Sequence, residues 1–291
     1  MATSVRPRRS VLYMPGSNAR ALEKGRSLPA DGLILDLEDA VAPDAKRDGR
    51  AEVARALESR DAYGARELVV RVNGLDTPWG HADLTAMARA GADAILLPKV
   101  DSSDTVRRAL HVLDLGGAPA GLQIWCMMET PRGILHAEEI ANQEHVHCLV
   151  MGTSDLTKDL QAHHTRQRLP MLASLELCLL AARSARISIV DGVHLDLNDE
   201  AGFAEACRQG RELGFDGKTL IHPKQIDAAN AAFGPTEVEV AWARRIIEAS
   251  EAAKAVGKGV VVVDGKLVEN LHVLEARRVV AMAEAIAGRS A

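Results

Sequence analysis

Short apolar segments alternate with amphipathic segments eight times along the first 230 residues, and this alternation limits the possible folds more than any other feature. The amphipathic segments are rich in Ala, Leu, Arg and Glu, so the pattern is that of strands alternating with helices. Eight such units favour an α/β fold of the closed (β/α)₈ TIM-barrel type over an open doubly wound sheet. The predicted strands are SVLYMPG (10–16), GLILDLED (32–39), ELVVRVNG (67–74), AILLPKV (94–100), LQIWCMMET (122–130), CLVMGTSD (148–155), ISIVDGVHLD (187–196) and KTLIHPKQI (218–226).

The last sixty residues have a different character. They predict a charged helix, a short hairpin that turns at Asp264–Gly265 and a second helix, at residues 235–256, 257–272 and 274–287. This segment is too small for a core of its own. We therefore expect a barrel at residues 1–230 and, at residues 231–291, a C-terminal helical and hairpin segment that acts as a lid or in oligomerisation.

Charge and apolar patterning exclude several classes of function. The net charge of −5 and the pI near 6.1 argue against a nucleic-acid surface, which needs a basic stripe. The longest uncharged stretch, Gly116 to Met128, is too short to span a bilayer, so no membrane partner is expected. The four cysteines form no CxxC pair and lie in apolar settings, which favours reduced core residues in a cytoplasmic protein.

Polar residues gather at the carboxyl end of each predicted strand, where the active sites of barrels are found. Two of them, Glu129 in WCMMETPRG and Asp155 in MGTSD, follow neighbouring strands that would lie about 4.8 Å apart. Two close carboxylates repel unless a cation lies between them, and ligands that are all oxygen suit Mg²⁺ or Mn²⁺. The alternative is that Glu129 pairs with Arg132 or Arg71 while Asp155 caps the following helix.

Arg71, in VVRVNG, lies at a strand end that is otherwise built of Val. Its guanidinium could bind a carboxylate, thioester or enolate oxygen, or it could form a structural salt bridge to Glu38 or Asp39, and the sequence does not choose. Glu38 and Asp39 are expected to support the metal ligands from close by. Lys99 could form a Schiff base, but the nearby acids favour a lysine that balances their charge.

Seven motifs together resemble the citrate lyase beta-subunit-like and malyl-CoA lyase family, in order and over nearly the whole chain. They are RSVLYMPGSNARALEK, LDLEDAVAPDAK, RVNGLDTPWG, ILLPKV, METPRGI, MGTSDL and DGKTLIHPKQI. The resemblance implies a (β/α)₈ barrel in a homo-oligomer, a trimer or a hexamer, with the lid over a neighbouring subunit's site. It also implies Mg²⁺ and, as substrate, a CoA thioester of a 3-hydroxy diacid.

By position, the resemblance makes Glu129 and Asp155 the metal ligands, with Glu129 also near the substrate. Arg71 would hold the oxygen of the oxo acid or of the developing enolate. Tyr13 and Lys24 would contact CoA, and Ser154 would lie near the substrate.

Two positions depart from the family pattern. Asn18 stands where many members carry Arg, which puts a phosphate contact in doubt. Glu269, in KLVENLH, stands where the lyases carry an Asp that acts as acid and base across the subunit interface. Glutamate is one methylene longer, and KLVENLH resembles the branch that includes malyl-CoA thioesterases.

Three hypotheses follow. The first is a Mg²⁺-dependent lyase that cleaves malyl-, methylmalyl- or citramalyl-CoA to acetyl- or propionyl-CoA and glyoxylate or pyruvate, with Arg71 and Glu269 catalytic. The second is a thioesterase that uses the same site to hydrolyse malyl-CoA to malate and CoA. The third is a non-catalytic CoA-binding subunit, which the two departures motivate and the retained charges oppose.

Overall fold

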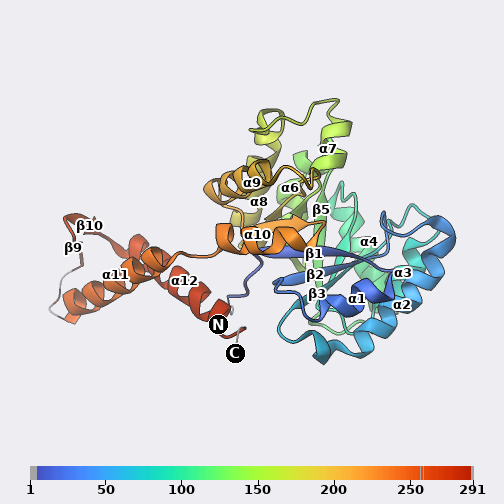
Figure 1. The fold of residues 1–291 in the computed structure, drawn as a ribbon, viewed down its shortest axis with the longest axis horizontal. Helices are drawn as coiled ribbons and strands as arrows, with labels where there is room; N and C mark the ends of the chain where they lie inside the picture. The colour runs from blue at the N-terminus through green and yellow to red at the C-terminus, as the bar shows by residue number, and fades with distance from the viewer. Residues whose placement is uncertain (1–4, 256, 258, 290–291) are drawn as a thin grey trace. The chain divides into compact units, whose positions relative to one another are not determined.

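The computed structural model describes residues 5–255, 257 and 259–289, and within them eight parallel strands close into a barrel (Figure 1). Closure is direct, because β1 pairs in parallel with both β2 and β8. The predicted (β/α)₈ barrel is therefore confirmed. Its strands are β1 (Ser10–Pro15), β2 (Gly32–Asp36), β3 (Glu67–Arg71), β4 (Ala94–Leu97), β5 (Gln123–Met128), β6 (Val146–Met151), β7 (Ser188–Asp191) and β8 (Gly217–Leu220).

Helices connect successive strands and surround the barrel (Figure 1). They are α1 (Ala19–Gly25), α2 (Lys46–Glu58), α3 (Gly80–Met87), α4 (Ser103–Leu115), α5 (Pro131–Leu135), α6 (Ala137–Ala141), α7 (Thr153–Asp159), α8 (Leu172–Ala185), α9 (Glu200–Leu213) and α10 (Ile226–Phe233). Short 3₁₀ turns are η1 (Pro43–Ala45), η2 (Arg60–Tyr63), η3 (Leu169–Met171) and η4 (Pro223–Gln225). None of the helices in the described part of the chain is long and apolar enough to cross a membrane.

Several strands are shorter at their carboxyl ends than the apolar runs predicted. Strand β6 ends at Met151, so the prediction that Asp155 ends this strand is wrong; Asp155 lies in the first turn of α7. Strand β8 ends at Leu220, and His222 is the N-cap residue of the turn η4. After β6 the buried pattern continues because Gly152 and Thr153 are also buried, whereas Ile221 and His222 after β8 are exposed.

The inside of the barrel is filled by alternate residues of the strands, as the two-residue period of a strand requires. Trp125 is completely buried there, among Val69, Cys148 and Val190. Arg8 lies over its ring at 4.8 Å and pairs with the buried Glu67 at 2.7 Å. These contacts stabilise the barrel core, away from the polar rim at the carboxyl ends of the strands.

The chain divides into two compact units, one of residues 8–232 and one that contains residues 233–289 and the few residues before Arg8. The second unit consists of α11 (Glu237–Ala255), β9 (Val261–Val263), β10 (Lys266–Val268) and α12 (Asn270–Ala287). Its hairpin turns at Asp264–Gly265, where both residues have positive φ angles of 48° and 75°, as a tight two-residue hairpin turn requires. Residues 256 and 258, within the predicted helix and hairpin, lie outside the described residues.

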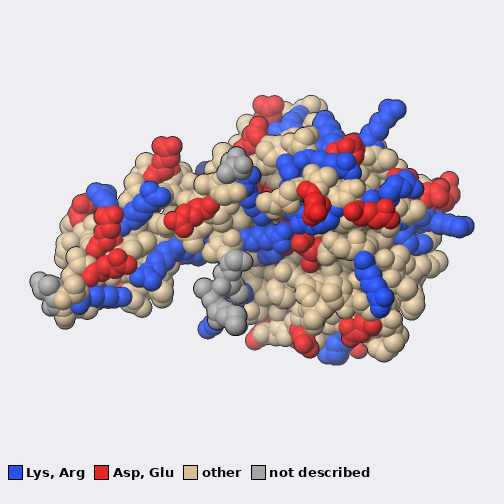
Figure 2. Space-filling model, turned by 90° about the horizontal axis from the view of Figure 1, so that it is seen from below, with Lys and Arg blue, Asp and Glu red and all other residues tan. Residues whose placement is uncertain are grey.

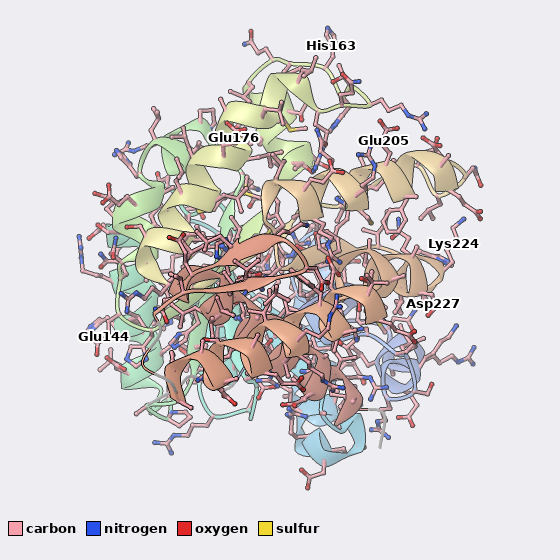
Figure 3. All side chains as sticks on the ribbon, turned by 90° about the vertical axis from the view of Figure 1, so that its left-hand side faces the viewer. Glu144, His163, Glu176, Glu205, Lys224 and Asp227 are labelled. Carbon is pink, nitrogen blue, oxygen red and sulfur yellow. The ribbon has the colours of Figure 1, made fainter. Side chains whose placement is uncertain are left out.

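Charged side chains of both signs lie among one another on the face shown in Figure 2, as is usual for a solvated surface. His163 lies at the outer edge of the molecule in Figure 3, in the loop that follows α7, and its side chain is exposed.

Candidate active site

A cavity of about 360 Å³ opens at the carboxyl ends of the barrel strands. Its polar wall includes Arg71, Glu129 and Asp155, three of the residues predicted from the sequence. Its apolar wall is formed by Met127, Met151, Val193, Leu195 and Ile221. The cavity therefore has a charged side and an apolar side, which suits a ligand that carries both an anionic group and an acyl chain.

Glu129 directly follows β5 and is only 2% exposed. Its Oε1 accepts a hydrogen bond from the backbone N–H of Lys99 at 2.7 Å, so this contact is with backbone rather than with Arg71 or Arg132. Burial raises the pKa of Glu129 to about 7, although the Lys99 N–H opposes the rise. A cation beside this carboxylate would favour its charged form.

Gly152 explains how the chain accommodates that carboxylate. A Cβ atom at this position would lie 2.4 Å from Glu129 Oε2, which no real side chain can do. The glycine therefore leaves space for Glu129 directly before α7, the helix that carries Asp155. Asp155 is half-buried and lines the same cavity, so the structure brings the two predicted metal ligands to one site.

Arg71, the last residue of β3, is held by three acids, of which one ends β2 and two follow it. Its Nε and Nη2 donate to the two oxygens of Asp36 at 2.7 and 2.6 Å. Its Nη1 lies 2.8 Å from Glu38 and 3.4 Å from Asp39. Burial disfavours the charged guanidinium, but the bond to Asp36 and the nearby acids raise the pKa of Arg71 well above its usual value.

Both alternatives for Arg71 thus have a structural counterpart, since it forms salt bridges and also lines the cavity. The sequence named Glu38 and Asp39 as its partners, whereas the bidentate partner is Asp36. Asp36 also accepts hydrogen bonds from the backbone N–H groups of Glu38 and Ala40, so it closes the turn after β2. Sequence alone gave no signal for that pairing, because the acids lie within four residues of one another.

Lys99 and Glu38 form a longer ion pair, with 3.6 Å between Nζ and Oε1. Burial raises the pKa of Glu38, and the Arg71 guanidinium opposes this. Burial lowers the pKa of Lys99, but Glu38, Asp155 and Glu129 outweigh that effect and raise it. Lys99 is therefore an ammonium ion at neutral pH, as expected of a residue that balances charge and not of a Schiff-base nucleophile.

The remaining predicted residues are less closely grouped. Tyr13 and Ser154 line the cavity, and the buried Ser154 Oγ has no hydrogen-bond partner among the described residues. Lys24 is exposed on α1 and does not line the cavity. Asn18 caps α1 by accepting a hydrogen bond from the backbone N–H of Ala21 at 3.1 Å. Glu269 precedes α12 in the C-terminal unit, and its acid–base role stays a prediction.

Of the apolar wall, the sequence indicated Met127 as a pocket residue, whereas Val193, Leu195 and Ile221 were missed because only polar residues were sought at those strand ends. Val193 and Leu195 lie two residues apart just after β7, and Ile221 directly follows β8. The available signal was therefore the two-residue spacing of apolar side chains, which continues beyond the end of β7.

The oxygen donors suit a hard cation. Within the described residues no group of three or more His, Cys, Asp or Glu side chains is arranged to hold a metal ion. Mg²⁺ is usually held by one or two carboxylates together with waters and substrate oxygens, so Glu129 and Asp155 are a sufficient protein contribution.

Comparisons with known proteins agree with this geometry. Residues 9–223 match the family described as HpcH/HpaI aldolase/citrate lyase. The chain is 52% identical over 287 residues to the (3S)-malyl-CoA thioesterase of Cereibacter sphaeroides (strain KD131 / KCTC 12085), covering 99% of this chain and 98% of the relative. It is 40% identical over 285 residues to citrate lyase subunit beta of Escherichia coli (strain K12), covering 96% and 94% of the two chains.

Solved structures of other proteins are also similar to this chain. The CitE protein of Mycobacterium tuberculosis, in complex with magnesium, acetoacetate and coenzyme A, superposes with a TM-score of 0.75 at 28% identity. The match covers 97% of this chain and 98% of that protein. RipC from Yersinia pestis superposes with a TM-score of 0.66 at 28% identity, over 80% and 97% of the two chains.

Proposed function

Since this chain belongs to the HpcH/HpaI aldolase/citrate lyase family, we propose that it is a Mg²⁺-dependent enzyme that hydrolyses malyl-CoA to malate and CoA. The observation that carries this proposal is the 52% identity, over nearly the full length of both chains, to a protein named (3S)-malyl-CoA thioesterase. The sequence alone had favoured carbon–carbon cleavage, with hydrolysis as the rival. We now put hydrolysis first.

Glu129 and Asp155 are the proposed ligands of the Mg²⁺ ion, which is present in the similar CitE structure. The fit rests on two carboxylates that line one cavity, and on the buried Glu129, whose raised pKa makes a cation beside it favourable. When bound, the ion supplies a Lewis acid that polarises substrate oxygens. The same site could take Mn²⁺, which also prefers oxygen ligands.

The chain's own residues bind and orient the thioester. Arg71 stays charged and faces the cavity, so it would bind the terminal carboxylate of the substrate or an oxygen that gains negative charge during reaction. Tyr13 and Ser154 would contact the substrate from the cavity wall, and Lys24 would meet the CoA phosphates outside it. Glu38 and Asp39 would hold Arg71 in place.

In hydrolysis, a water molecule adds to the thioester carbonyl carbon, the carbon–sulfur bond breaks, and the CoA sulfur leaves with a proton. The same charged groups could instead support cleavage of the carbon–carbon bond. This second candidate is favoured by the 40% identity to citrate lyase subunit beta of E. coli. For either reaction, Glu269 is the proposed group that exchanges the proton.

We also propose that residues 231–291 act as a lid and in assembly of a trimer or hexamer. Support comes from apolar side chains that are more than half exposed in the C-terminal unit, namely Val238, Val260, Val262, Leu267, Leu271 and Leu274. Such side chains are typical of surfaces that a partner covers. The four free, buried cysteines agree with a reducing compartment, so the cytoplasm is the proposed location.

One assay separates the candidates. The protein is incubated with malyl-CoA and Mg²⁺, and free thiol is measured alongside glyoxylate trapped as a hydrazone. We expect thiol release without glyoxylate. Equal amounts of glyoxylate and acetyl-CoA would establish the lyase instead, and CoA binding without turnover of any acyl-CoA tested would favour a non-catalytic subunit.

A further inference from the structure

Lys46, the first residue of α2, is a buried lysine that does not line the cavity. Its ammonium group donates hydrogen bonds to the loops that follow β2 and β3. Its side chain is among the buried polar residues, at 6% exposure. Its Nζ donates to the backbone carbonyls of Leu37 and Glu38 at 2.8 and 2.7 Å and to Asn73 Oδ1 at 2.8 Å. All three ammonium hydrogens are thus used, on two loops that follow neighbouring strands.

The loop after β3 is fixed by the same network. Asn73 donates from Nδ2 to the carbonyl of Leu37 at 2.9 Å and to Asp83 Oδ2 at 2.6 Å. Asp83 is completely buried and pairs with Arg50 at 2.7 Å. Lys46 therefore joins the loop after β2 to the loop after β3, and that junction is itself anchored to two helices.

This network fixes the backbone of Glu38 on both sides. Its backbone N–H donates to Asp36 Oδ1 at 2.9 Å, and its backbone carbonyl accepts from Lys46. With both sides of the residue fixed, the Glu38 carboxylate lies 2.8 Å from Arg71 Nη1. Removal of the ammonium would leave the buried Asn73 Oδ1 without the donor that Lys46 supplies. It would also take one donor from each carbonyl, since Leu37 keeps Asn73 Nδ2 and Glu38 keeps the backbone N–H of Val41. The loops after β2 and β3 would then shift as water replaces the lost ammonium.

We propose that Lys46 is a positioning residue that orients Glu38, and through it the Arg71 guanidinium, for the substrate. Burial lowers the pKa of Lys46, and the negative charges of Asp36 and Glu38 oppose this. Keeping a charged ammonium at this buried position therefore costs free energy of folding. Lys46 is the last residue of the motif LDLEDAVAPDAK, and the sequence alone predicts no role for it. The proposal concerns the proposed active site and rests on that function for its kinetic test.

The kinetic test uses Lys46→Met, which keeps the length of the side chain and removes its charge and hydrogen bonds. Lys46→Arg restores a cation, and the exposed neighbour Arg47→Met is the matched control. We expect Lys46→Met to lower kcat/KM for malyl-CoA about 10- to 100-fold, the effect of a small displacement of a binding group. Lys46→Arg should recover part of the loss, and Arg47→Met should match the wild type.

A double-mutant cycle with Glu38→Gln distinguishes positioning from general destabilisation. If Lys46 acts through Glu38, adding Lys46→Met to Glu38→Gln should lower kcat/KM less than about 3-fold further. An equal fold-loss in both backgrounds, or a lower melting temperature with unchanged kcat/KM, would overturn the proposal.

The geometric claim has a test that does not depend on turnover. In a crystal structure of Lys46→Met, the Glu38 carboxylate should leave the position 2.8 Å from Arg71 Nη1 that it has in the wild type. An unchanged contact would overturn the proposal whatever the substrate is. If the wild type does not act on malyl-CoA, the proposed function fails, and this structure still decides the role of Lys46.

Discussion

Glu129→Gln should stabilise the metal-free protein at alkaline pH while abolishing its response to Mg²⁺. Burial raises the pKa of Glu129 from the ordinary 4.5 to about 7 in the folded protein. Because the folded pKa is raised, the favourable contribution of the neutral carboxyl is fully present below about pH 4.5 and is lost as the pH rises through 7. At about 1.4 kcal/mol for each pKa unit, the loss by pH 8 is about 3 kcal/mol.

Glutamine keeps an oxygen that can accept from the Lys99 N–H and removes the charge. The variant should therefore match the wild type near pH 4.5 and exceed its free energy of unfolding by about 3 kcal/mol at pH 8. For a chain of this size, that difference corresponds to a melting temperature higher by roughly 5–10 °C.

The assay is thermal unfolding of both proteins after treatment with EDTA, at several pH values between 4.5 and 8, repeated with excess Mg²⁺. Mg²⁺ should raise the melting temperature of the wild type and leave that of the variant unchanged, because only a ligand that binds the folded state stabilises it. The reasoning is refuted if the two metal-free proteins differ by the same amount at every pH. It is also refuted if Mg²⁺ stabilises both equally.

Three further predictions concern the proposed metal site and one buried ion pair. Asp155→Asn, or removal of metal with EDTA, should reduce the rate of malyl-CoA turnover by at least about 100-fold, and added Mg²⁺ should restore only the EDTA-treated wild type. Gly152→Ala places a Cβ 2.4 Å from Glu129 Oε2, so it should abolish Mg²⁺-dependent stabilisation while circular dichroism still reports the barrel; a variant that keeps the response would contradict the steric argument. Asp191→Asn leaves the buried Lys218 without the partner 2.8 Å away and should cost about 3–5 kcal/mol in chemical denaturation, whereas a loss below about 1 kcal/mol would show that the charge is compensated elsewhere.

The sequence predicted the barrel because burial and periodicity are local signals that repeat eight times. It also predicted the hairpin turn at Asp264–Gly265, since few residues adopt the positive φ angles of that turn. It misplaced Asp155, because CLVMGTSD continues from a buried strand into the half-buried first turn of a helix without a break in composition. The apolar pattern of this segment therefore indicated which residues are buried and did not indicate where the strand ends.

Partners across the fold were harder to predict than positions along it. The pairing of Arg71 with Asp36 rather than with Glu38 or Asp39 alone depends on the parallel register that sets Asp36 beside Arg71. Lys46 and Lys218 were not singled out, because a lysine in the sequence gives no sign of being buried. Long-range ion pairs such as Arg168 with Asp191, at 2.7 Å, are visible only after folding brings the elements together.

The direct pairing of β1 with β8 means that the ring of strands is cyclic, with no strand that must come first. A circularly permuted chain could therefore be cut between Gly116 and Gly121, in the loop before β5, and joined from Ala232 to Arg8 by a linker. Every strand would keep both neighbours, and the cut would lie at the end of the barrel opposite the cavity. Such a permutant would free the barrel unit from the C-terminal unit and allow the proposed metal site to be studied without residues 233–289.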